Sequence, residues 1–267
     1  MDQPQPSIRV EVVDSVATIT MDRPETRNRL DLAGMALMRD LVLQAGGDES
    51  VRVVIITGSG STFCAGADLA AASSAQGLGT GALHALGDLL TAIADCPKPT
   101  IARVAGHVAG GGNGLVAACD IAVASADARF AFSEVRLGVA PAVISVTCLA
   151  VMNRRDAQEL LLTGERVDAE RVRRAGLVTR VAEPEALDAV VRGYVSQFLA
   201  GGPQALATTK ELIRRIPSMS RDEAFAWTAE VSTALFTSPE AAEGMAAFLS
   251  KRPASWTLEA ATGPARP

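Results

Sequence analysis

Residues 106–134 read GHVAGGGNGLVAACDIAVASADARFAFSE, and this stretch decides the fold. Three consecutive glycines at 110–112 end an apolar strand-like run, and a small-residue segment with helical character follows them at 113–119. The strand DIAVAS comes next, and a carboxylate arrives at Glu134. Such an order presents free backbone N–H groups to a negatively charged atom, beside a group that can move protons. A tight turn that needs small residues, with Glu134 on a solvated surface, is the alternative for this stretch alone.

The composition limits the classes of protein to which this chain can belong. The chain has 267 residues, 48% of them hydrophobic, which suffices for one large domain or a domain with an appendage. Its net charge of −5 argues against nonspecific binding to nucleic acid. The four cysteines form neither a CxxC pair nor a cluster with metal-ligand spacing, which is typical of buried thiols in a reducing compartment. With no signal pattern and no long apolar run, we expect a cytoplasmic protein without a membrane span.

Hydrophobic runs predict an α/β core followed by helices. Strands are expected at 8–13, 16–21, 51–58 and 100–104, helices at 32–45 and 82–95, and a long loop at 58–72. Beyond residue 141, helices are expected at 153–163, 168–175, 185–200, 203–215 and 221–236, with one short strand at 177–182. A last helix is expected at 238–249, with Ser238 as its N-cap. We therefore predict an α/β core at 1–200 and a helical region at 201–267 that serves oligomerisation.

Two small-residue loops, CAGADL (64–69) and AGGGNG (109–114), each follow a predicted buried strand. One backbone N–H group from each loop could converge on a carbonyl oxygen, which large side chains would block. That arrangement is an oxyanion hole, whereas two close-packed turns are the structural alternative. A Ser-His-Asp triad is disfavoured because no G-x-S-x-G elbow accompanies the two histidines. No GxGxxG with a downstream acid is present, which disfavours a dinucleotide-binding oxidoreductase.

The chain resembles the crotonase (enoyl-CoA hydratase/isomerase) family over roughly residues 8 to 256. The blocks that carry the resemblance are MDRPETRNRL, VRVVIITGSGSTFCAGADL, CPKPTIARVAGHVAGGGNGLVAACDIAVAS, FAFSEVRLGVAP, LLTGERVDAERVRRAGLVTRV and EGMAAFLSKRPASW. The resemblance implies an α/β fold, with a spiral of ββα units and a helical C-terminal trimerisation region. It also implies acyl-CoA substrates, no metal or redox cofactor, and trimers or pairs of trimers.

The resemblance further assigns roles to single residues. The oxyanion-hole N–H groups fall on Ala67 and Gly111, and Glu134 is the acid/base. The residues implied to bind the CoA thioester are Ala65, Asp68 and Leu69 at the CoA entry, Arg27, Asn28 and Arg29 around the adenine, and Lys251 on a CoA phosphate, often from a neighbouring subunit.

One departure from the family pattern leaves the reaction open. Typical hydratases of the family carry two glutamates, and Gly114 stands where the first would be. PAVIS (141–145) also replaces a glycine-rich segment, a combination that resembles the branch with bacterial methylglutaconyl-CoA hydratase-like proteins. Enoyl-CoA hydration, Δ3,Δ2-enoyl-CoA isomerisation and acyl-CoA binding without catalysis remain the candidate functions. The space at Gly114 either holds part of a bulkier or carboxylated acyl group or awaits a second carboxylate. We expect residues 73–90 and 140–150 to shape the acyl pocket.

Overall fold

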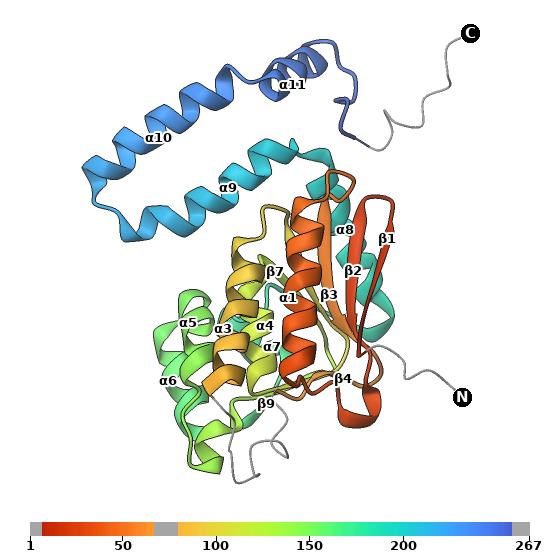
Figure 1. Ribbon diagram of the computed structural model, residues 1–267, viewed down its shortest axis with the longest axis vertical. Coiled ribbons are helices and arrows are strands. Elements are labelled where there is room, and N and C mark those ends of the chain that lie inside the picture. The colour runs from red at the N-terminus through yellow and green to blue at the C-terminus, as the bar shows by residue number, and fades with distance from the viewer. Residues whose placement is uncertain (1–6, 67–79, 258–267) are drawn as a thin grey trace.

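In the described part of the chain, the strands form a six-stranded and a four-stranded sheet, with helices packed against them (Figure 1). The computed structural model describes residues 7–66 and 80–257. The larger sheet has the order β1-β2-β3-β5-β7-β10, antiparallel between β1 and β2 and parallel thereafter. Its strands are β1 (Ile8–Val13), β2 (Val16–Met21), β3 (Val53–Gly58), β5 (Thr100–Val104), β7 (Ile121–Ser125) and β10 (Arg180–Ala182). The strands predicted at 8–13 and 16–21 are confirmed and form a hairpin, with positive φ at Asp14 and Ser15 in its turn.

Helices cover both faces of the larger sheet. Alternate residues of β3 point to opposite faces: Ile56 packs in the buried cluster that includes α1 (Leu32–Gly47) and α3 (Thr80–Asp95). Ile55 packs instead in the cluster that includes α8 (Leu187–Ala200). Burial on both faces explains why β3 reads as a continuous apolar run rather than an alternating one.

The smaller sheet was not predicted from the sequence. It has the order β4-β6-β8-β9, with strands β4 (Thr62–Cys64), β6 (His107–Ala109), β8 (Arg129–Ala131) and β9 (Arg166–Asp168). The expected loop at 58–72 was wrong where β4 lies, because a strand of three residues is too short to show a period.

The chain passes repeatedly from the larger sheet to the smaller one and then into a helix. β3 and β4 precede α3, β5 and β6 precede α4 (Gly111–Ala118), and β7 and β8 precede α5 (Ala142–Val151). The predicted spiral of ββα units is confirmed, although α5 was not expected as a helix. All four cysteines are free and buried, as their apolar surroundings predicted.

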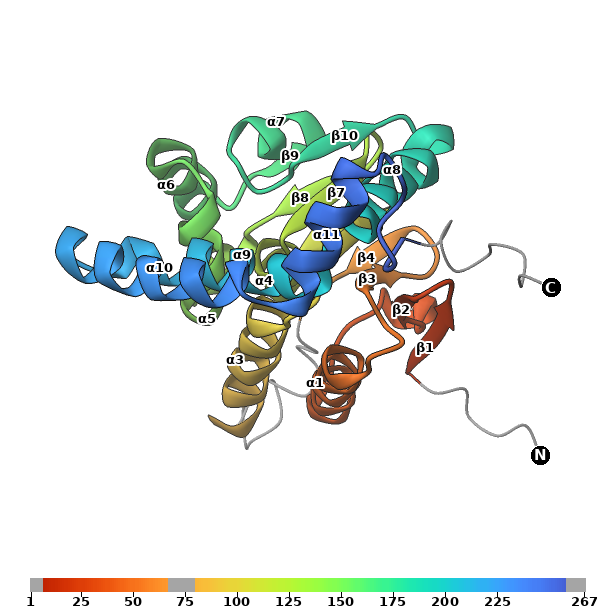
Figure 2. The ribbon, with the colours of Figure 1, turned by 90° about the horizontal axis from the view of Figure 1, so that it is seen from above.

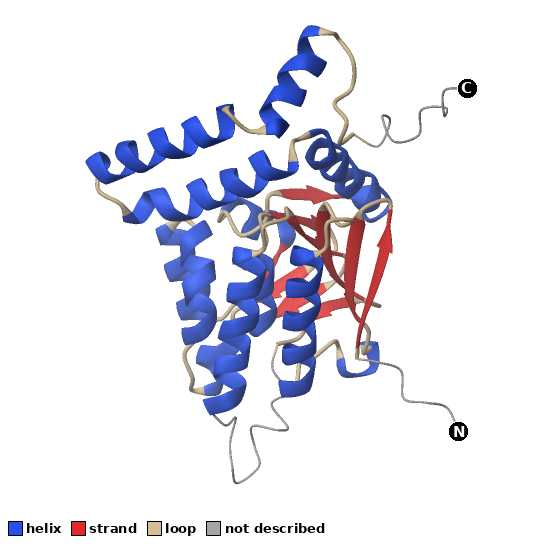
Figure 3. Ribbon diagram, turned by 45° about the horizontal axis from the view of Figure 1, so that its top comes forward, coloured by secondary structure: helices blue, strands red, loops and turns tan. Residues whose placement is uncertain are grey.

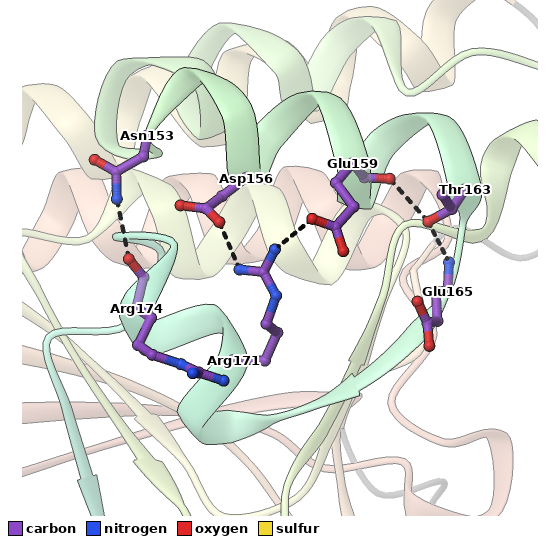
Figure 4. Close-up of polar contacts among 7 residues, drawn as sticks. All are labelled: Asn153, Asp156, Glu159, Thr163, Glu165, Arg171 and Arg174. Atoms are coloured by element: carbon purple, nitrogen blue, oxygen red, sulfur yellow. Dashed lines mark hydrogen bonds and ion pairs between the residues drawn. The ribbon is translucent and has the colours of Figure 1, made fainter.

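A salt-bridged pair of short helices closes the spiral (Figure 4). Arg171 of α7 (Ala169–Arg174) donates to Asp156 at 2.7 Å and to Glu159 at 2.9 Å, both on α6 (Arg154–Thr163). The end of α6 in turn accepts a 3.2 Å hydrogen bond at the carbonyl of Thr163 from the Nε of Arg136. Arg136 lies in the short helical segment η2 (Ser133–Leu137), so this pair of helices supports the segment that carries Glu134.

The last three helices form an arm outside the two sheets. These are α9 (Pro203–Arg215), α10 (Arg221–Phe236) and α11 (Pro239–Leu249), with the bounds that the sequence predicted. α9 runs along one end of the core, and α10 projects beyond it in both Figure 1 and Figure 2. Figure 3 shows the arm as helices joined by loops, with no strand among its described residues. Ser220 and Glu223 form a capping box at the start of α10, which is why the local sequence locates that end well.

Few contacts bury the arm against the core. Across the three helices, only Ala247 is buried, whereas Phe248 is 83% exposed. Lys210 of α9 lies 2.6 Å from Asp120, and Arg52 donates to the carbonyl of Gly201 at 2.7 Å. The division into a core at 1–200 and an oligomerisation region at 201–267 stays a prediction. No helix in the described residues is long and apolar enough to span a bilayer.

Candidate active site

The two small-residue loops meet at Gly66. Its φ of +88° is strained for any residue with a side chain, and a Cβ there would lie 3.0 Å from the carbonyl oxygen of Ala109. The same Cβ would lie 3.1 Å from the backbone nitrogen of Gly111. The predicted convergence of the loops is therefore confirmed for residues up to Gly66. Ala67, Asp68 and Leu69 lie outside the described residues, so their roles stay predictions.

Backbone hydrogen bonds hold both loops in place. Ala65 donates to the carbonyl of Arg27 at 3.1 Å, and Leu30 donates to the carbonyl of Gly66 at 3.1 Å. Gly110 donates to the carbonyl of Ala131 at 3.2 Å on the neighbouring strand. The segment that leads into residue 67 is thus fixed by the loop at 27–30, and the glycine turn is fixed by the small sheet.

Gly111 is the first residue of α4, where an α-helix leaves its N–H groups without intrahelical acceptors. The next residue is glycine because α4 packs directly on β4: a Cβ at Gly112 would lie 2.5 Å from the carbonyl oxygen of Cys64. This close approach aims the start of α4 at the loop that contains Gly66. The helix dipole adds partial positive charge at the same place, which favours a developing oxyanion.

Glu134 faces the glycine turn from η2. Its Oε1 lies 3.6 Å from the position of a Cβ on Gly110, so a side chain there would crowd the carboxylate. Its Oε2 is buried and has no hydrogen-bond partner among the described residues. Burial raises the pKa of Glu134, because removal from water disfavours the charged form. A carboxylate in this state is a stronger base than an exposed one.

An apolar cavity of about 330 Å³ adjoins Glu134, Gly66 and Gly111. Among its described lining residues, Glu134 is the only one with an ionisable side chain. The apolar lining comes from α3 and from residues 140–150, which overlap the two segments predicted to shape the acyl pocket, and from the end of η2. Its larger side chains are Leu83, Leu86, Leu137, Val139, Val143 and Ile144.

The space beside Gly114 is not open to a ligand, so the alternative that it holds part of the acyl group was wrong. A Cβ on Gly114 would lie 2.7 Å from Cγ2 of Ile144 and 3.2 Å from Cδ1 of Leu90. Thr147 of α5 also donates to the carbonyl of Gly114 at 3.3 Å. Gly114 is therefore the point of close packing between α4 and α5. The sequence could not show this, because α5 was not recognised as a helix.

Gly114→Glu should accordingly destabilise the fold rather than supply a second carboxylate. We expect a loss of about 3 kcal/mol or more in the free energy of unfolding, since the variant overpacks the core and buries a charge. Denaturant unfolding measures this change, with Gly193→Glu as a matched control, because a Cβ on Gly193 of α8 meets no atom within 4 Å. Adding Ile144→Ala should recover part of the loss. A Gly114→Glu protein as stable as the control would contradict this packing.

The residues predicted around the CoA adenine have different environments. Asn28 is buried, and its side-chain amide donates to the carbonyls of Ser59 at 2.8 Å and Thr62 at 2.6 Å. Its oxygen also accepts from the backbone N–H of Arg23 at 2.9 Å, so this side chain holds the loop together. Arg27 is exposed, with a left-handed φ of 59°.

The other predicted residues are less closely tied to the cavity. Arg29 donates from its Nε to the carbonyl of Thr26 at 3.1 Å. Lys251 follows α11 in the arm and lines no part of the apolar cavity. Asn113 is buried, and its side-chain amide donates to the carbonyls of Gly110 and Ala131. The described site therefore brings together Glu134, Gly111 and Ala65, and the CoA contacts of the remaining residues stay predictions.

The chain is similar to known proteins over almost its whole length. The family model described as enoyl-CoA hydratase/isomerase matches residues 11–259. A carnitinyl-CoA dehydratase of Citrobacter koseri is 34% identical over 251 residues, which cover 90% of this chain and 94% of that protein. A crotonyl-CoA hydratase of Syntrophomonas wolfei is 31% identical over 253 residues, which cover 94% and 97%. The crystal structure of an enoyl-CoA hydratase from Mycobacterium smegmatis superposes with a TM-score of 0.90 at 35% identity, covering 94% of this chain and 99% of that one.

Proposed function

Because the chain belongs to the enoyl-CoA hydratase/isomerase family, we propose that it adds water to the double bond of an unsaturated acyl-CoA. The observation that carries this proposal is the buried carboxylate oxygen of Glu134, which has no hydrogen-bond partner in the part of the chain that the structure describes and lies beside the meeting point of the Gly66 and Gly111 loops. A base with a raised pKa and a set of backbone donors are the two components that enolate chemistry requires.

In the proposed reaction, the thioester oxygen accepts hydrogen bonds from the N–H groups of Gly111 and Ala67. Glu134 takes a proton from water while the water oxygen bonds to the β-carbon. The electrons of the double bond move toward the thioester, and the α-carbon receives a proton from the Glu134 carboxyl. A single carboxylate can serve both proton transfers if addition is concerted and occurs on one face.

Δ3,Δ2-enoyl-CoA isomerisation is the second candidate, and the single carboxylate favours it. Glu134 would remove a proton from C2 and return it to C4, with no water in the reaction. The apolar side chain of Ile144, packed against Gly114, stands where a second glutamate could otherwise hold water.

Oxygen-18 water distinguishes the two candidates. The purified protein is incubated with 2-enoyl-CoA and 3-enoyl-CoA substrates in H₂¹⁸O, and the products are analysed by mass spectrometry. Hydration adds the labelled water to the product, whereas isomerisation moves the double bond without a change in mass. Glu134→Gln serves as the matched control. Unchanged substrate across short, medium and branched acyl groups would leave only the non-catalytic binding function.

We further propose that the protein assembles as a trimer or a dimer of trimers through its helical arm. The exposed apolar side chains Phe225, Phe236, Phe248 and Leu249 support this proposal, because water contact with so much apolar surface is unfavourable. Light scattering should give three or six times the chain mass of 27.6 kDa. Phe248→Asp should lower that mass, whereas a wild-type monomer would contradict the proposal.

A further inference from the structure

The outer face of the small sheet carries a second cavity, of about 570 Å³. Side chains alternate along its strands: Val108 and Phe130 point into the core, so their neighbours His107 and Arg129 point outward. Arg166 reaches the same cavity from β9, and Arg27 reaches it from the loop that follows β2. Four basic side chains from four separate segments thus line one polar cavity.

These positive charges have few negative partners. Arg27 and Arg166 make no ion pair with any described residue. Arg129 donates from Nη1 to the carbonyls of residues 126, 127 and 128, at 3.3, 3.2 and 3.0 Å, and its other two nitrogens have no partner in the described residues. Glu25 is the only carboxylate among the described lining residues, and its side chain is 68% exposed and 3.8 Å from Arg23.

The pKa of His107 shows that the charges of the three arginines act at the same place. Its pKa is lowered first by burial and then by the charges of Arg166, Arg129 and Arg27. Its Nδ1 is buried and has no hydrogen-bond partner among the described residues. In a chain with a net charge of −5, the described residues thus gather cations around a polar group, and neither the cations nor that group has a full set of partners among those residues. Mutual repulsion of this kind is relieved by a bound anion.

We propose that this cavity binds a phosphate group through Arg27, Arg129 and Arg166. Guanidinium groups match phosphate oxygens in pairs, and their charge persists at any physiological pH. The cavity is separate from the apolar cavity at Glu134, but Ala65 lines both. The phosphate can therefore come from a free anion or nucleotide, or from the CoA part of a substrate bound at Glu134. Only the CoA source depends on the function proposed for the Glu134 site.

Isothermal titration calorimetry tests the proposal with four probes: inorganic phosphate, ADP, CoA and dephospho-CoA, which lacks the 3′-phosphate. The proteins are the wild type, Arg166→Gln and Arg27→Gln, with Arg155→Gln as a matched control, because Arg155 is an exposed arginine of α6 outside this cavity. Circular dichroism establishes that each variant is folded. Loss of one charged contact should raise the dissociation constant on the order of tenfold or more, and added salt should weaken binding further.

The four probes separate the two sources of phosphate. Binding of inorganic phosphate or ADP that weakens in Arg166→Gln and Arg27→Gln supports a site for a free anion. Tighter binding of CoA than of dephospho-CoA, with the difference lost in those variants, supports a site for the CoA phosphate. The proposal is overturned if the wild type shows neither behaviour, or if both variants bind all four probes as Arg155→Gln does.

Failure here is distinguishable from failure of the reaction at Glu134. Acyl thioesters of N-acetylcysteamine carry no phosphate, so their turnover depends on the Glu134 site alone. If such a substrate is turned over while the calorimetry shows neither kind of phosphate binding, the phosphate site is overturned and the proposed reaction is intact.

Discussion

Replacing Glu134 by glutamine is expected to lower turnover about 100- to 10,000-fold, the usual range for general acid–base catalysis. The amide keeps the shape of the side chain beside Gly110 but can neither accept nor return the proton. Steady-state kinetics on the substrate identified in oxygen-18 water measure the loss. Affinity for CoA should change little, because Glu134 faces the acyl end of the site. Full activity in a folded Glu134→Gln protein would exclude Glu134 as the base.

The raised pKa of Glu134 adds a pH signature and a stability signature. As the pH is lowered, the wild-type rate should begin to fall at a pH above the ordinary titration range of glutamate, because only the deprotonated carboxylate acts as the base. The folded protein binds this proton more tightly than the unfolded chain does. Its contribution to stability is therefore full below the unfolded pKa and is lost as pH rises through the folded pKa. At neutral pH, the buried charged carboxylate destabilises the folded protein. Glu134→Gln removes that charge, so the melting temperature of the variant should equal or exceed that of the wild type.

Gly66→Ala is expected to lower turnover on the order of 100-fold, because it disturbs the backbone donors of the proposed oxyanion hole. The new Cβ would lie 3.1 Å from the backbone nitrogen of Gly111, so the two loops must move apart. A positive φ of 88° adds about 1–3 kcal/mol of strain. Steady-state kinetics measure the loss of turnover, and denaturant unfolding measures the loss of stability from the strain.

Gly47→Ala is the matched control for Gly66→Ala, since a Cβ on Gly47 meets no atom within 4 Å. That variant should keep both stability and turnover. A folded Gly66→Ala protein with wild-type turnover would mean that the oxyanion donors lie elsewhere than at the junction of the two loops.

Features encoded by neighbouring residues were predictable. The helices α9, α10 and α11 have the predicted bounds, because proline, serine and the capping box mark their starts. The buried strands of the larger sheet were found from apolar runs, since each is covered on both faces. The resemblance to the crotonase family then placed Glu134 and Gly111 in one site, and the structure brings them together.

Short elements and contacts between distant segments were not predictable. The strands β4, β6, β8 and β9 have three residues each, too few for a period to appear. The sequence shows Gly114, but only the packing of α5 shows that Ile144 fills the space beside it. The gathering of Arg27, Arg129 and Arg166 likewise requires the small sheet, which the sequence did not reveal.

The sequence by itself determined the long strands of the larger sheet and the ends of the C-terminal helices, because these depend on local hydrogen bonds and apolar periodicity. The family resemblance singled out Glu134 as the proposed base. The tertiary structure alone decided that Glu134 is desolvated, that Gly114 is filled and that cations gather on the outer sheet. Burial and electrostatic interaction depend on distances in space, and residues far apart in the chain come within a few ångströms only after the sheets have formed.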